Sequence, residues 1–205
     1  MRCSVSLARF KVAAAAAGAL LASSPAWASA EAAPGNDTAR PAVWMPKQIH
    51  FVFQGFTTRY SCDGLRDKVR KALLELGARP DLKVTEGACA NPAGGPESFP
   101  NVDVKMQVLK PAAAAGNDAG DDSHPDTVSA HWKAVDLRLD RDPIRQAEDC
   151  ELLEQIKHTF LPLFTTRNVD YQSSCIPHQV SPGGTWLRAE VLTADPHDKH
   201  AVSGR

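Results

Sequence analysis

Four cysteines constrain the fold of this chain more than any other feature of its sequence. Cys62 and Cys150 each begin a stretch in which apolar residues recur at helical spacing. Cys89 and Cys175 follow 27 and 25 residues later, at the ends of short predicted strands. A helix that packs against the strand after it runs antiparallel to that strand, so the second cysteine returns to the level of the first. We therefore predict the disulfides Cys62–Cys89 and Cys150–Cys175.

A cysteine at the start of a helix can instead be a reactive thiol, because the helix dipole favours its thiolate form. The chain contains no C-x-x-C motif, and each helix-start cysteine has a second cysteine at a suitable distance. Four cysteines remain once Cys3 is removed with the signal peptide predicted for residues 1–30, and an even number in an exported chain is typical of disulfides. The pattern favours structural cysteines over catalytic ones.

The predicted helix at Cys62 has clear start and stop signals. Ser61 can cap its first turn, Gly77 can adopt the left-handed conformation that ends a helix, and Pro80 prevents continuation. Asp149 precedes the second helix as Ser61 precedes the first, so we expect Asp149 to cap that helix in the same way.

Residues 1–30 predict a secretory signal peptide. They combine three basic residues, an apolar run from Val12 to Ala22 and an A-x-A cleavage site that ends at Ala30. The run is shorter than the roughly 18 residues needed to cross a bilayer, and Cys3 would be removed with it. We expect a periplasmic or secreted protein, in a compartment where disulfides form.

The rest of the chain predicts two units with the same order of elements. Alternating apolar residues indicate strands in residues 48–54, 102–110, 132–140 and 187–194, with the two cysteine helices and two short strands between them. We predict an α+β two-layer sandwich of two βαββ units, with a mostly antiparallel sheet, both helices on one face and one disulfide in each unit. The expected divisions are a disordered segment at 31–44, the first unit at 45–110, an acidic low-complexity linker at 111–130, the second unit at 131–194 and a flexible tail at 195–205.

The repeated order suggests an internal duplication. Counted from the first cysteine of each unit, Leu65 corresponds to Leu153. Other helix positions differ, since Val69 falls opposite Lys157. We interpret the two units as structural duplicates whose sequences have diverged.

Charge and motifs restrict the possible functions. Removal of the predicted signal peptide leaves 20 Lys and Arg against 24 Asp and Glu, without a basic stripe, so we expect no nucleic-acid partner and no membrane contact after cleavage. The chain has no G-x-S-x-G, H-E-x-x-H, phosphate-binding glycine loop or dinucleotide fingerprint. We therefore expect no cofactor, and the pattern favours a non-catalytic protein; a hydrolase with an unrecognised site is one alternative.

A second alternative is a periplasmic metal-handling protein. His197 and His200 stand close enough in the sequence to share a metal ion, and Asp121–His124 offers oxygen and nitrogen ligands. Both groups lie in polar segments without predicted helix or strand, which do not fix a coordination geometry.

Two loops rich in proline and glycine are the main candidates for a binding site. Each follows the second cysteine of a unit, contains Gly-Gly and has an aromatic residue near its end. Disulfides beside the loops would let them present similar edges to an unknown protein or small-molecule ligand, whereas a simple hairpin connection is the alternative. We predict an exported, non-catalytic binding or adaptor protein whose candidate binding residues are Gly94, Gly95, Phe99, Gly183, Gly184 and Trp186.

Overall fold

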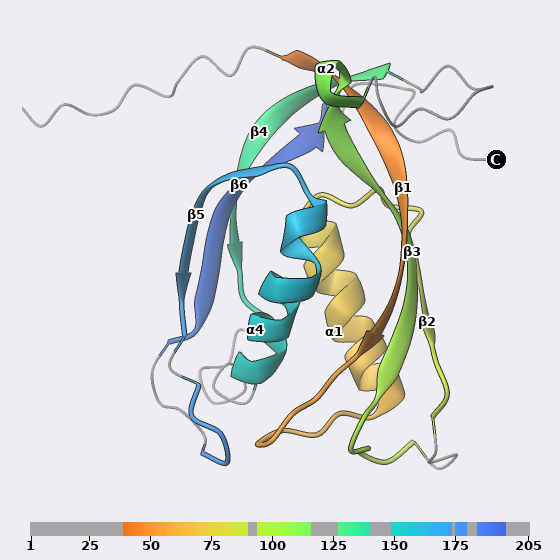
Figure 1. Ribbon diagram of the computed structural model, residues 1–205, viewed down its shortest axis with the longest axis vertical. Helices are drawn as coiled ribbons and strands as arrows, with labels where there is room; N and C mark the ends of the chain where they lie inside the picture. Colours follow the sequence, from red (N-terminus) through yellow and green to blue (C-terminus); the bar gives the residue numbers. More distant parts are fainter. Residues whose placement is uncertain are drawn as a thin grey trace, which may run out of the picture. The chain divides into compact units, whose positions relative to one another are not determined.

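The computed structural model describes residues 39–89, 94–115, 127–139, 149–173, 175–179 and 184–195, which form an α+β fold (Figure 1). The six strands build one antiparallel sheet in the order β2-β3-β1-β4-β6-β5. This confirms the predicted α+β class and the antiparallel sheet. The elements in chain order are β1 (Arg40–Val52), α1 (Cys62–Glu75), β2 (Lys83–Glu86), β3 (Asn101–Pro111), α2 (Ala112–Ala115), β4 (Thr127–Leu137), α4 (Cys150–Thr159), the 3₁₀ turn η1 (Leu161–Leu163), β5 (Thr166–Gln172) and β6 (Trp186–Ala194).

Helix α1 begins and ends where its sequence predicts. The Ser61 hydroxyl accepts a hydrogen bond from the backbone N–H of Gly64 at 3.3 Å, which satisfies one N–H of the first turn. Gly77 has a φ of +90°, a conformation that strains any residue with a Cβ. Leu65, Val69 and Leu73 are fully buried and form the apolar face of the helix.

Helix α4 differs from the prediction at its start. Asp149 occupies the residue before the helix, but its carboxylate makes no capping hydrogen bond. One carboxylate oxygen accepts from the Tyr60 hydroxyl and the other from the Lys68 ammonium, both at 2.5 Å. The expected cap was therefore wrong, because a tyrosine and a lysine from the first half of the chain satisfy this buried carboxylate instead.

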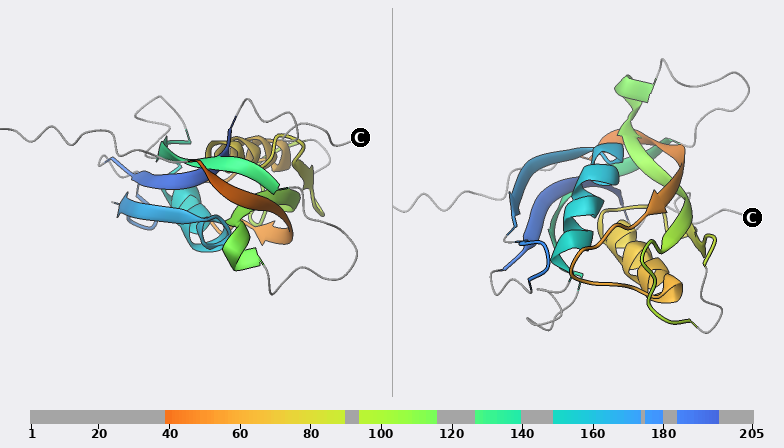
Figure 2. Two further views of the ribbon diagram at one scale, coloured as in Figure 1. Left: turned by 90° about the horizontal axis from the view of Figure 1, so that it is seen from above. Right: turned by 60° about the horizontal axis from the view of Figure 1, so that its bottom comes forward.

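The main hydrophobic core joins both long helices to the sheet. Val104 of β3 and Val191 of β6 are fully buried in it, together with Val69 of α1 and Ile156 of α4. In both Figure 1 and the right-hand view of Figure 2, α1 and α4 lie side by side against the curved sheet. No helix among the described residues has the length and apolarity to cross a membrane.

A second apolar cluster lies on the opposite face of the sheet. Its members alternate along the strands with residues of the main core, so their side chains point the other way. The guanidinium of Arg79 lies 5.9 Å from the Trp44 ring centroid, and that of Arg167 lies 4.5 Å from the Trp132 ring centroid. The buried residues of the cluster are Ala42, Trp44, Leu109, Val128, Ala130 and Leu192.

Two predicted boundaries are wrong because strand pairing extends past them. Residues 31–44 were expected to be disordered, but β1 begins at Arg40 and its residues 42–44 are buried. Residues 111–130 were expected to form a linker, but Thr127–Ala130 belong to β4 and Ala112–Ala115 form α2. Pairing of Arg40–Val43 with Thr127–Ala130 in the sheet overrides the local composition of these two strand segments. The predicted signal peptide and residues 116–126 lie outside the described residues.

The two halves of the sheet are joined over a short distance. Strand β1 pairs with β3 from Ala42 to Val52, but with β4 only through Arg40–Val43. From this junction the strands spread apart toward the end of the sheet where the loops 53–61, 94–100 and 175–179 lie (Figure 1).

Candidate functional site

Both predicted disulfides are present in the structure. The Cα atoms are 6.4 Å apart for Cys62–Cys89 and 5.7 Å apart for Cys150–Cys175, within the usual range for a disulfide. Each bridge joins the first residue of a long helix to the segment that follows the next strand in the chain. The cysteines are therefore structural, and each bridge fixes the beginning of a loop.

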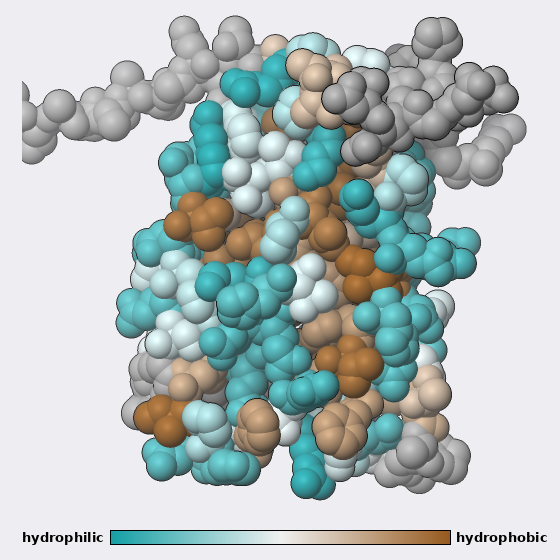
Figure 3. All heavy atoms as spheres, in the orientation of Figure 1, coloured by the Kyte–Doolittle hydropathy of each residue, from teal (hydrophilic) through white to brown (hydrophobic). Residues whose placement is uncertain are grey.

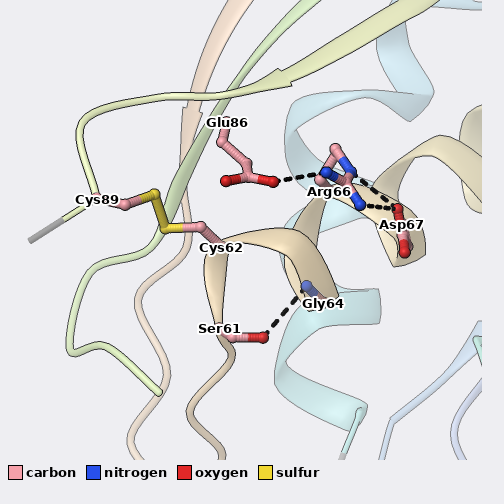
Figure 4. A network of polar contacts seen from close by, with 7 residues as sticks. All are labelled: Ser61, Cys62, Gly64, Arg66, Asp67, Glu86 and Cys89. Carbon is pink, nitrogen blue, oxygen red and sulfur yellow. Dashed lines mark hydrogen bonds and ion pairs between the residues drawn. A yellow bond between two sulfur atoms is a disulfide. The ribbon is translucent and has the colours of Figure 1, made fainter. Parts of the chain in front are cut away.

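The surroundings of the first bridge form a small acidic hollow. The Arg66 guanidinium binds Glu86 at 2.6 Å and also contacts Asp67 (Figure 4). A hydrogen bond from the Ser61 hydroxyl lowers the pKa of Asp63. A cavity of about 210 Å³ is lined by both cysteines, the carboxylates of Asp63, Glu86 and Glu97, and the glycines at 94 and 95.

Three large apolar side chains are exposed on the loops at this end. Phe56 is 67% exposed, Phe99 is 62% exposed and Ile176 is 50% exposed. The ring of Phe56 meets the ring of His178 edge-on, with centroids 5.7 Å apart. Figure 3 shows apolar atoms at the lower edge of this face, where the loops lie in Figure 1. We call Phe56, Phe99, Ile176 and His178 the loop-end surface.

The buried carboxylate of Glu151 holds the loop 53–61 against α4. It accepts hydrogen bonds from the backbone N–H of Phe56 at 2.9 Å, the backbone N–H of Thr57 at 3.1 Å and the Thr57 hydroxyl at 3.0 Å. One turn along the helix, the Gln155 side chain exchanges two hydrogen bonds with the backbone of Gln54. The loop is thus bound by a helix that lies about 95 residues away in the sequence.

Tyr60, Lys68 and Asp149 form a second tie between the halves. The Asp149 side chain is only 5% exposed, and both of its oxygens accept hydrogen bonds. The backbone N–H of Glu97 donates to the Tyr60 carbonyl at 3.0 Å and so attaches the loop 94–100 to the same tyrosine. Because the three polar side chains satisfy one another, the group stabilises the loops and needs no chemical role to explain it.

The predicted binding residues have different environments. Gly94 has a φ of +73° and lines the acidic hollow with Gly95, while Phe99 belongs to the loop-end surface. Trp186 is half-buried, with the Arg188 guanidinium 4.4 Å from its ring centroid, and Gly184 is exposed beside it. Gly183, His197, His200 and Asp121–His124 lie outside the described residues.

The described residues contain one group of three side chains close enough to share a metal ion. These are Cys62, Cys89 and Glu97, whose ligand atoms lie within 4.8 Å of one another. Both sulfur atoms are joined in the disulfide, so neither is available as a thiolate ligand. The group gives no support for a metal site in the oxidised protein.

Comparisons of the chain with protein-family models, curated proteins and solved structures gave no match. Sequence reasoning found the two bridges, because these depend on local pattern and spacing. It missed Phe56, Glu151 and the buried carboxylate of Asp149. Each of these acts through a contact between the two halves of the chain, and nothing in the local sequence indicates such a contact.

Proposed function

We propose that this chain is an exported, non-catalytic binding protein that docks a partner protein on its loop-end surface. The observation that carries the proposal is the exposure of Phe56 and Phe99 on loops that are otherwise firmly held. Large exposed apolar groups with polar surroundings are typical of protein interaction sites. Aromatic side chains have few rotatable bonds and therefore lose little conformational entropy on binding, so they are effective anchors.

Restraint of the loops supports docking without a large loss of entropy. The Glu151 carboxylate accepts hydrogen bonds from the backbone N–H groups of the successive residues Phe56 and Thr57. The Cys62–Cys89 bridge and the hydrogen bond between Glu97 and Tyr60 restrain the loop that carries Phe99. A surface that is ordered before binding has less conformational entropy to lose.

The acidic hollow indicates the chemistry of the partner. Three carboxylates line it, and Glu97 stands two residues before Phe99 in the same loop. Charge complementarity favours a partner that presents apolar side chains with a lysine or arginine beside them. Such a basic side chain would enter the hollow while the apolar groups cover Phe99 and Phe56.

The two disulfides support export to the periplasm or the extracellular space. Disulfides persist in oxidising compartments and are rare where thiols are kept reduced. The predicted signal peptide at residues 1–30 is consistent with this location.

Strand register supports the proposal that the two βαββ units arose by duplication. Arg40 pairs with Ala130, and Ala42 pairs with Val128. At a spacing of 88 residues, Arg40 corresponds to Val128 and Ala42 corresponds to Ala130, so the two pairs are related by exchange of the two strands. Reciprocal pairing of this kind is the pattern of a two-fold axis. The same spacing of 88 residues relates Cys62 to Cys150.

The following strands repeat the relation with shorter spacings. Cys89 and Cys175 are 86 residues apart. At a spacing of 83 residues, the buried positions of β3 correspond to buried positions in and next to β6. The buried positions at this spacing are Val102 and Thr185, Val104 and Leu187, Met106 and Ala189, Val108 and Val191, and Leu109 and Leu192. Two- and three-residue deletions in successive loops of the second unit account for the change in spacing.

A site-specific photo-crosslinker tests the docking surface. A benzoylphenylalanine placed at Phe99 in the full-length exported protein should capture one partner, while the same group at the exposed Val169 of β5 should not. The captured protein should then bind purified wild-type protein at least about tenfold more tightly than the Phe56→Ala/Phe99→Ala variant in calorimetry. Equal capture from both positions, or equal affinity of the variant, would refute the proposal.

The metal-handling and hydrolytic alternatives stay as predictions from the sequence. The candidate histidines of the metal-handling alternative, His197 and His200, lie outside the described residues.

A further inference from the structure

A second concave site lies on the sheet face opposite the two long helices. It has a volume of about 370 Å³ and is formed by β1, β3 and the start of β2. Val84 and Val104 belong to the main core, so the neighbouring Lys83 and Lys105 point to the other face. We call this site the lysine groove; its polar lining includes Gln48, Asp81, Lys83, Lys105 and Gln107.

Two like charges stand directly opposite each other in the lysine groove. Lys83 pairs with Lys105 in the register of β2 and β3. Opposite residues of an antiparallel pair have Cβ atoms about 5 Å apart, and like charges at opposite positions are destabilising. On the other side of Lys105 the register places Gln48, which carries no charge. Neither lysine forms an ion pair with a described residue.

The one carboxylate in the lining of the groove is already bound. Asp81 accepts a hydrogen bond from the Arg79 Nε at 2.8 Å, and this contact lowers the pKa of Asp81. The Arg79 side chain therefore holds the Asp81 carboxylate at one end of the groove. The facing ammonium groups of Lys83 and Lys105 form no ion pair with a described residue, although the charge of Lys83 also contributes to the lowered pKa of Asp81.

In the other half of the sheet, the base at the corresponding position has carboxylates on the neighbouring strands. In β6 the register places Arg188 between Asp136 of β4 and Asp170 of β5. The Arg188 Nε lies 3.3 Å from Asp136, so the positive charge is compensated within the sheet. Across β4, β6 and β5 this row of residues is Asp136, Arg188 and Asp170, with two acids and one base. Across β1, β3 and β2 it is Gln48, Lys105 and Lys83, with one amide and two bases.

We propose that the lysine groove binds an oxyanion, the phosphate or sulfate group of a small ligand. One such group bridging Lys83 and Lys105 would supply negative charge to them as Asp136 does to Arg188. The side-chain amides of Gln48 and Gln107 provide further hydrogen-bond donors in the lining. This site is separate from the loop-end surface, so it does not depend on the proposed docking function.

Titration of the full-length mature protein with inorganic phosphate, at constant ionic strength, tests the groove. The changes in the amide chemical shifts of β2 and β3 should reach a plateau as phosphate is added. Lys83→Gln or Lys105→Gln should weaken the binding about tenfold or more. The matched control Lys133→Gln, an exposed lysine of β4, should leave the affinity unchanged. Titrations with inorganic sulfate and with phenyl phosphate distinguish the sources of the oxyanion.

A charge-compensating variant separates binding from a purely structural effect. Gln48→Asp places a carboxylate opposite Lys105, as Asp136 stands opposite Arg188. It should raise the melting temperature without ligand and at the same time weaken phosphate binding about tenfold. The proposal is overturned by non-saturating shifts in the wild type, by equal affinities of the lysine variants and Lys133→Gln, or by a Gln48→Asp variant that binds phosphate as the wild type does.

Discussion

Substitution of Glu151 by glutamine tests how the loop 53–61 is held. In the wild type, the carboxylate accepts hydrogen bonds from two backbone N–H groups and the Thr57 hydroxyl. Glutamine has nearly the same shape but only one acceptor oxygen, and its amide nitrogen would face the N–H groups that the second oxygen now binds. At least one partly buried donor therefore loses its acceptor.

The structure sets the size of this effect. A hydrogen bond to a charged group contributes about 1.5 to 3 kcal/mol, and an unsatisfied buried donor costs about 1 to 3 kcal/mol. Because the Phe56 and Thr57 N–H groups are only partly buried and water can replace some of the bonding, we expect Glu151→Gln to lower the free energy of unfolding by about 2 kcal/mol. Glu154→Gln on the same helix is the matched control and should change stability by less than about 0.5 kcal/mol.

Urea denaturation followed by tryptophan fluorescence measures the change in stability. Hydrogen exchange measured by NMR should show that the Phe56 and Thr57 amides exchange faster in Glu151→Gln than in Glu154→Gln. If the two variants have the same stability and the same exchange rates at these amides, Glu151 does not hold the loop as described.

Two further predictions concern the covalent and ionic contacts. The Cys150→Ser/Cys175→Ser variant should lose about 3 to 4 kcal/mol of unfolding free energy, as expected for a loop closed over 25 residues, and unfolding of the wild type with and without reductant checks this. Contact with Arg79 lowers the pKa of Asp81 below its unfolded value, so this residue stabilises the fold above about pH 4 and the contribution disappears as the pH falls further. Because the Asp81 side chain is 47% exposed, Asp81→Asn should lose less than about 1 kcal/mol at pH 7 and should equal the wild type in stability near pH 2. A constant difference between the two across this range would contradict the assignment.

Features that depend on neighbouring residues could be predicted from the sequence. The alternation of Val102, Val104 and Val108 indicates a strand covered on one face, and the structure contains that strand. The spacing of Cys62 and Cys89 matches one helix and one returning strand, so their pairing follows from the lengths of those elements.

Features that depend on contacts between distant segments could not be predicted. Asp149 looks like a helix cap in the sequence, and only the position of Tyr60 and Lys68 gives it a different role. Trp44 stands in a segment with the composition of a disordered tail, yet pairing with Leu109 and burial under Arg79 make it part of the sheet. Composition reports local preference, and these contacts contribute free energies larger than that preference.

The sequence by itself determined the order of the six strands and the two long helices, and the partners of the four cysteines. These follow from periodicity and chain length, which act over a few residues. The tertiary structure alone decided that Glu151 binds the loop carrying Phe56, and that Lys83 faces Lys105 without a carboxylate between them. The position of a side chain relative to another strand or helix depends on register and packing across the whole sheet, and the local pattern of residues does not encode that relation.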